Sequence, residues 1–166
     1  MTKKIGFGGG CHWCTEAYFQ SLKGVEEVEQ GWISAVTPNE AFSEAVIVHY
    51  DEHVIALNIL ISIHLHTHAS TKNHSFRGKY RSAVYVFDST IEATKDIIVA
   101  KQKDFKELII TEVLPFKAFK LNSETQQNYF KKHKEGHFCQ KYISPKTLYF
   151  RTTHSAKLGS THSQND

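Results

Sequence analysis

The sequence of 166 residues has only three cysteines and three prolines, and it lacks a long hydrophobic run. No apolar stretch approaches the roughly 20 residues of a membrane-spanning helix, so we expect no such helix and no membrane partner. The first ten residues include two lysines but no apolar segment long enough for a secretory signal, and a cytoplasmic location is expected. In a reducing compartment, the closely spaced Cys11 and Cys14 indicate metal binding or redox catalysis instead of a structural disulfide.

The chain has the composition of one folded domain. Its apolar fraction of 40% is enough for a hydrophobic core, and a disordered chain would carry fewer large hydrophobic residues and more net charge. The net charge is +3, and the basic residues are scattered. The densest groups, Lys101/Lys103/Lys106 and Lys131/Lys132/Lys134, alternate with acidic or apolar residues on predicted helices. We interpret them as solvated helix faces and expect no nucleic-acid partner.

The hydrophobic pattern predicts an α+β fold. Strands are expected at residues 4–8, 25–33, 44–50, 80–87 and 109–114, and helices at residues 13–23, 54–65, 89–108 and 123–132. The order as far as Phe87 is that of a split βαβ unit, so we expect a two-layer sandwich with a ferredoxin-like core plus extra helices and a strand. One domain is expected over residues 1–150, followed by a C-terminal tail at 151–166. The polar stretch 66–79 has no periodicity and predicts a long functional loop.

The strongest local signal is the segment Gly8-Gly9-Gly10-Cys11-His12-Trp13-Cys14-Thr15-Glu16. Glycines between a strand and a helix allow a sharp turn and leave the next side chain accessible. Cys11 is then expected at a helix start, where the positive end of the helix dipole lowers the thiol pKa and favours the thiolate. The segment therefore predicts a nucleophilic cysteine in preference to a buried structural one.

This segment resembles the Gly-Cys-Phe-Trp-Cys signature of the peptide methionine sulfoxide reductase A family. Further similar segments occur in the family's order, and together they span roughly nine-tenths of the chain, which is far more specific than any single motif. They are Leu22-Lys23-Gly24-Val25, Gly31-Trp32, Ser43-Glu44-Ala45-Val46 with Tyr50-Asp51, Tyr80-Arg81-Ser82-Ala83, Thr111-Glu112-Val113 with Pro115 and Phe119, Glu124, Tyr129, and Cys139 with Ile143-Ser144-Pro145-Lys146.

The resemblance implies a thiol-dependent reductase of methionine S-sulfoxide, free or in proteins, that needs no cofactor. Cys11 is the implied nucleophile and Glu44 the implied acid that protonates the leaving oxygen. Tyr80 is the implied phenol that binds this oxygen. Cys139 matches a resolving cysteine that converts the sulfenic acid to a disulfide, and Cys14 is its rival, although its place one helix turn from Cys11 makes a bond harder. A thioredoxin-type reductant then resets the enzyme.

The resemblance also implies a substrate pocket, which departs from the family pattern. Trp13 matches an aromatic wall for the substrate methyl group, and Tyr129 matches a further substrate-binding residue. His12 replaces the usual phenylalanine and makes one wall polar. Trp32 stands where a second oxygen-binding tyrosine is expected, and its indole N–H donates without accepting.

Two further segments depart from the family. The His-Asp-Pro-Thr segment is replaced by residues 64–67, and the acid-containing loop before the Tyr-Arg-Ser motif is replaced by residues 73–79. We interpret the chain as a divergent branch that retains the chemistry with a reshaped pocket.

Two alternatives from other classes remain open. Cys11 and Cys14, together with His64, His66, His68 and His74, are residue types that bind zinc, although the histidines lack a standard spacing. A general C-x-x-C thiol-disulfide oxidoreductase is the second alternative. A metal site predicts zinc in the purified protein, whereas an oxidoreductase predicts a Cys11–Cys14 bond on oxidation.

Overall fold

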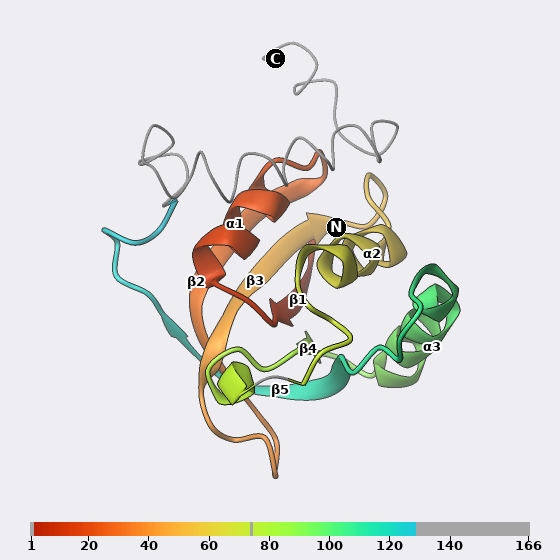
Figure 1. The fold of residues 1–166 in the computed structure, drawn as a ribbon. Coiled ribbons are helices and arrows are strands. Elements are labelled where there is room, and N and C mark those ends of the chain that lie inside the picture. Colours follow the sequence, from red (N-terminus) through yellow and green to blue (C-terminus); the bar gives the residue numbers. More distant parts are fainter. Residues whose placement is uncertain (1, 74, 129–166) are drawn as a thin grey trace.

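Helices are interspersed among the strands along the chain, as Figure 1 shows for the computed structural model, which describes residues 2–73 and 75–128. The elements are β1 (Thr2–Gly8), α1 (His12–Gln20), β2 (Val25–Ala35), β3 (Ser43–Asp51), α2 (Leu57–Thr67), the 3-10 helix η1 (Ser75–Gly78), β4 (Ala83–Val86), α3 (Ile91–Lys101), the 3-10 helix η2 (Gln102–Asp104) and β5 (Glu112–Leu121). The structure confirms the coarser part of the α+β expectation, a mixed fold of helices and strands with a strand-dominated core.

The five strands form a closed barrel in the order β1-β3-β2-β5-β4. The β4–β5 pair is parallel, and the other pairs are antiparallel. The expected two-layer sandwich with a split βαβ core is not confirmed, because β5 pairs with both β2 and β4 and closes the sheet. These pairings join residues far apart in the sequence, and strand periodicity alone does not specify such partners.

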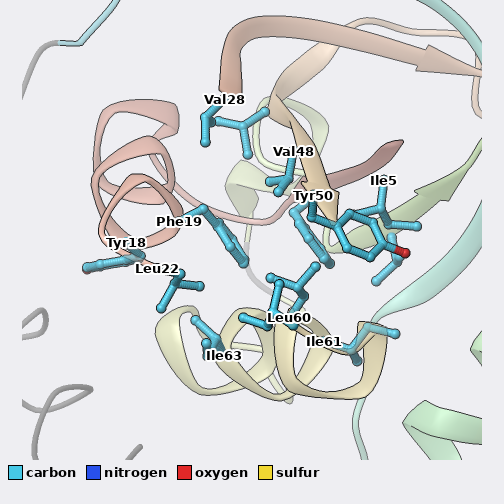
Figure 2. Close-up of a cluster of buried hydrophobic side chains, with 14 of the residues drawn as sticks. Ile5, Tyr18, Phe19, Leu22, Val28, Val48, Tyr50, Leu60, Ile61 and Ile63 are labelled. Atoms are coloured by element: carbon cyan, nitrogen blue, oxygen red, sulfur yellow. The ribbon is translucent and has the colours of Figure 1, made fainter. Parts of the chain in front are cut away.

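Strand β3 is buried on both faces and separates two hydrophobic clusters. Val46 and Val48 belong to the cluster between the barrel and the helices, whereas Ala45 and Ile47 belong to the cluster inside the barrel. This alternation follows the two-residue period of a strand. Figure 2 shows side chains of α1 and α2 meeting those of the strands in the outer cluster. Glu44, two residues before Val46, therefore lies on the face that the helices cover.

Strand β5 begins and ends later than the sequence predicts. The expected strand stops at Leu114, and the next residue, Pro115, lacks the N–H that a central strand needs. In the structure, Pro115 is the last residue that pairs with β4, and Phe116 is the first that pairs with β2. The missing N–H therefore falls where the strand changes partner.

Two predicted helices differ from the observed structure. The helix expected at 89–108 ends at Lys101, and the Gln102 side chain bonds the backbone N–H of Ile109 and the carbonyl of Glu107. The helix expected at 123–132 is a turn at residues 124–128, and the rest of it lies outside the described residues. The expected boundary near residue 150 also lies outside them.

Among the described residues, no helix combines the length and the apolar character needed to cross a bilayer.

Candidate active site

Cys11 lies at the start of α1, where the glycine run after β1 turns the chain. Gly9 has a φ of +144°, and a Cβ at this position would collide with the ring of His68. Only glycine adopts this conformation without strain. The Cys11 side chain is half-buried at the helix N-terminus, as the sequence predicts.

The surroundings of Cys11 favour its thiolate form. A hydrogen bond with the Cys14 side chain lowers the Cys11 pKa most, and the backbone N–H groups of Cys14 and Trp13 lower it further. Burial and the charge of Glu44 act in the opposite direction, but the pKa stays below its ordinary value. Hydrogen-bond donors stabilise a thiolate, so Cys11 is better suited to act as a nucleophile than an ordinary cysteine.

Glu44 reaches the N-terminus of α1 from β3. Its side chain is buried, and Oε1 accepts a hydrogen bond from the backbone N–H of His12 at 3.1 Å. Because His12 follows Cys11 directly, this bond places the carboxyl group beside the cysteine. The opening residues of β3 and α1 thus bring together the predicted nucleophile and the predicted acid.

The segment before β4 adds Lys79 and Tyr80 to the site. The backbone carbonyl of Lys79 accepts hydrogen bonds from the Glu44 N–H at 2.9 Å and the Ser43 hydroxyl at 2.8 Å. Lys79 Nζ lies 3.4 Å from Glu44 Oε2 and 5.2 Å from the centre of the Tyr80 ring. A hydrogen bond with Tyr80 and the charge of Glu44 raise the pKa of Lys79. Lys79 therefore interacts with both the predicted phenol, Tyr80, and the predicted acid, Glu44.

The indole rings of Trp13 and Trp32 lie near the His12 side chain. The Trp32 ring meets it edge-on at a centroid distance of 5.3 Å, and the Trp13 ring lies 6.3 Å away. Trp32 pairs with Glu44 across the β2–β3 ladder, so the two side chains share one face. The three predicted substrate-binding residues Trp13, Trp32 and His12 thus gather at the start of α1.

Arg77 connects the glycine turn before Cys11 to the segment that carries Tyr80. Its guanidinium donates hydrogen bonds of 2.9 Å to the backbone carbonyls of Gly9 and Tyr80. It also bonds the carbonyls of Ala69 and Lys72 within the loop. The rigid planar fork of arginine suits this bracing of several carbonyls. The loop predicted at 66–79 therefore positions Tyr80 relative to the turn that precedes Cys11.

The chain is similar to known proteins in sequence. The sequence model described as peptide methionine sulfoxide reductase matches residues 3–158. The peptide methionine sulfoxide reductase MsrA of Pasteurella multocida is 32% identical over 163 residues, covering 89% of this chain and 94% of that protein. The enzyme of the same name from a Psychrobacter species is 34% identical over 155 residues, covering 84% and 89%.

The chain belongs to the peptide methionine sulfoxide reductase family.

Solved structures from Saccharomyces cerevisiae share the fold. Mxr1 from Saccharomyces cerevisiae in reduced form superposes with a TM-score of 0.73 at 23% identity, covering 85% of this chain and 91% of that chain. Mxr1 in complex with Trx2 superposes with a TM-score of 0.61 at 22% identity, covering 77% and 84%. The chain therefore shares its overall fold with these structures.

Among the described residues, the structure does not assemble the zinc ligands of the metal-binding alternative, and His74 lies outside these residues. His64 Nε2 lies 2.7 Å from the Gly8 carbonyl oxygen, and His68 Nε2 lies 2.7 Å from the Ser82 hydroxyl. The His66 ring stacks on Phe105. Within residues 2–73 and 75–128, no three His, Cys, Asp or Glu side chains form a group that could hold a metal ion. Family membership favours the reductase over this alternative and over the general C-x-x-C oxidoreductase.

Cys139 and Tyr129 lie outside the described residues, so their predicted roles stay predictions. Sequence reasoning missed three residues of the site: Arg77, Lys79 and Asn122. Arg77 and Lys79 lie in the predicted functional loop at 66–79, just before Tyr80. Their place in this loop is the signal in the sequence that could have indicated them. Asn122 follows β5 and reaches His12 by a contact across 110 positions, for which the sequence has no local signal.

Proposed function

We propose that this protein reduces methionine S-sulfoxide, free or within proteins, to methionine by means of Cys11. The observation that carries the proposal is the hydrogen bond that places Glu44 at the N-terminus of α1, immediately beside a cysteine whose pKa is lowered. A nucleophile and a buried carboxyl group at one point are what a sulfoxide reduction requires.

In the proposed reaction, the Cys11 thiolate attacks the sulfoxide sulfur while Glu44 protonates the sulfoxide oxygen. The attack forms a bond between Cys11 Sγ and the substrate sulfur, and the protonated oxygen leaves that sulfur as hydroxide. Hydroxide then bonds to Cys11 Sγ while the sulfur–sulfur bond breaks, and the electron pair of the broken bond stays on the methionine sulfur. The products are methionine and a Cys11 sulfenic acid, so methionine sulfoxide is reduced and the cysteine is oxidised. Tyr80 binds the oxygen during this transfer, and Trp13, Trp32, His12 and Tyr129 form the pocket for the substrate.

A second thiol then attacks the sulfenic acid, releasing water and forming a disulfide. Cys139 is the proposed resolving cysteine, with Cys14 as the rival. A thioredoxin-type dithiol reduces the disulfide and restores the Cys11 thiol. The relative Mxr1, whose structure is known in complex with Trx2, supports this kind of partner. We place the whole reaction in one catalytic domain of residues 1–150 and in the cytoplasm.

The proposed stereochemistry can be tested with two peptides that differ only at the sulfoxide. Reduced protein is mixed with the S- or the R-sulfoxide peptide and dithiothreitol, and methionine is quantified by chromatography. We expect repeated turnover of the S-epimer and background conversion of the R-epimer. Free methionine S-sulfoxide, assayed in parallel, measures the preference for peptide-bound substrate. Equal conversion of both epimers, or none of either by correctly folded protein, would contradict the proposal.

A further inference from the structure

We propose that this site prefers peptide substrates that carry an acidic side chain near the methionine sulfoxide, and that Lys120 determines this preference. The inference rests on the proposed function, because it concerns the substrate of that reaction. Its basis is a row of side chains that leads from Glu44 to Lys120 across three neighbouring strands.

The register of the barrel fixes this row. Trp32 of β2 pairs with Glu44 of β3 on one side and with Lys120 of β5 on the other. Residues that pair directly across a sheet point to the same face, so Lys120 leaves the sheet on the face of the predicted acid. The residues after Glu44 and Trp32 and the residue before Lys120 all pack in the cluster inside the barrel, as strand alternation requires.

Lys120 is held at a defined place beside the proposed substrate pocket. The residue is exposed, and its Nζ lies 4.3 Å from the centre of the Phe42 ring, which is a cation–π contact. Phe42 is 38% exposed and lies two residues before Glu44. Among the described residues, Lys120 has no carboxylate partner. Its positive charge can therefore pair with a carboxylate of the substrate.

The other charged groups near the row do not cancel the charge of Lys120. Lys79 lies at the Glu44 end of the row, where its Nζ is 3.4 Å from Glu44 Oε2, so these two charges balance each other. Glu40, just before β3, pairs with Lys117 at the surface. The row therefore has one unbalanced charge, and that charge is positive.

The row also sets how far the acid lies from the sulfoxide. Neighbouring strands are about 4.8 Å apart, so the backbones of Glu44 and Lys120, with one strand between them, are roughly 10 Å apart. An extended peptide advances about 3.3 Å per residue. A substrate whose sulfoxide lies at Glu44 thus brings its second or third residue along the chain to Lys120.

The proposal is tested by competition between peptides that differ in charge. Three peptides with blocked termini carry methionine S-sulfoxide at the centre and Glu, Gln or Lys at the second and third positions on both sides. They are mixed with reduced protein and dithiothreitol at low salt, and mass spectrometry gives their relative kcat/KM. We expect the Glu peptide to exceed the Gln peptide about threefold, and the Gln peptide to exceed the Lys peptide to a similar extent. Both ratios should approach one in about 0.5 M salt, because salt screens exposed charges.

Two charge-reversal variants show whether the effect is local. Lys120→Glu is expected to reverse the order of the three peptides. Lys103→Glu is the matched control, because it makes the same change of net charge at an exposed residue of η2, outside the row. It should keep the wild-type order, and circular dichroism establishes that both variants fold. Equal kcat/KM for the three peptides at low salt, or the same reversal in both variants, would overturn the proposal.

Free methionine S-sulfoxide identifies the source of the recognised carboxylate. Its one carboxylate is the α-carboxylate, whereas the blocked Glu peptide has carboxylates only on side chains. We expect Lys120→Met to lower kcat/KM for the Glu peptide about threefold more than for free methionine S-sulfoxide. An equal loss with both substrates would mean that Lys120 binds the α-carboxylate, and this result would overturn the proposal.

Peptide binding to Cys11→Ser separates this inference from the proposed function. Isothermal titration calorimetry gives the Kd of the Glu and Lys peptides, with and without the additional change Lys120→Glu. We expect the Glu peptide to bind about tenfold more tightly, the product of the two threefold steps, and the order to reverse in the double variant. Equal binding of both peptides would overturn the inference. A wild type that converts no peptide, while this binding preference holds, would contradict the proposed function alone.

Discussion

Replacing Cys11 with serine is expected to reduce turnover of a methionine S-sulfoxide peptide by more than about 10³-fold, to the background rate. The physical reason is that a serine hydroxyl at this position is not ionised near neutral pH, whereas the environment of Cys11 lowers the pKa of its thiol. A hydroxyl also cannot take up the oxygen as a sulfenic acid. Turnover is measured with dithiothreitol as the electron donor, so that no protein reductant limits the rate.

Cys14→Ser is the matched control for this variant. It changes the same atom one helix turn away and keeps a hydroxyl that can donate to Cys11, so we expect activity within about tenfold of the wild type. Far-ultraviolet circular dichroism establishes that both variants fold. Activity of Cys11→Ser above one-tenth of wild type, or an equal loss in both variants, would contradict the assignment of Cys11 as the nucleophile.

Glu44→Gln is expected to lower the rate of sulfoxide reduction by about 10²–10⁴-fold, the usual contribution of a general acid. The amide retains the shape of the side chain and can still accept the His12 N–H, which lies 3.1 Å away in the native structure. It cannot deliver a proton to the sulfoxide oxygen. The loss should therefore appear in kcat with little change in substrate binding.

The same substitution should make Cys11 more reactive toward an alkylating agent. The charge of Glu44 raises the Cys11 pKa, so its removal lowers that pKa and shifts alkylation by iodoacetamide to lower pH. Faster alkylation with slower reduction separates a lost acid from a damaged site. Glu40→Gln is the matched control, because Glu40 pairs with Lys117 at the surface, and we expect both rates to stay unchanged. Slower alkylation in Glu44→Gln would contradict this account.

The positions of Cys11 and Glu44 could be predicted from the sequence because local patterns determine them. The glycine run and the helix that follows place Cys11 at a helix start, and strand alternation places Glu44 on the face that the helices cover. The closure of the barrel could not be predicted in this way. It depends on β5 changing partner after Pro115, a pairing set by contacts between distant strands.

The hydrogen bonds of the segment after β5 could not be predicted from the sequence either. Residues 123–128 have the sequence pattern of a helix start, but the Gln127 side chain bonds the backbone of Gln30, and the Asn128 N–H bonds Glu16. Asn128 adopts a positive φ of 59°, which is compatible with a turn and not with a helix. Tertiary hydrogen bonds here override local propensity, and a single sequence does not reveal them.

The most direct test of the central claim is the fate of the substrate oxygen in a single turnover. The double variant Cys14→Ser/Cys139→Ser, fully reduced, is mixed with one equivalent of the S-sulfoxide peptide and no reductant, and its peptides are analysed by mass spectrometry with dimedone as the trap. We predict one equivalent of methionine and one dimedone adduct, located on Cys11, because no second cysteine resolves the sulfenic acid. Methionine formed while Cys11 stays unmodified, or no methionine at all from folded protein, would contradict the account.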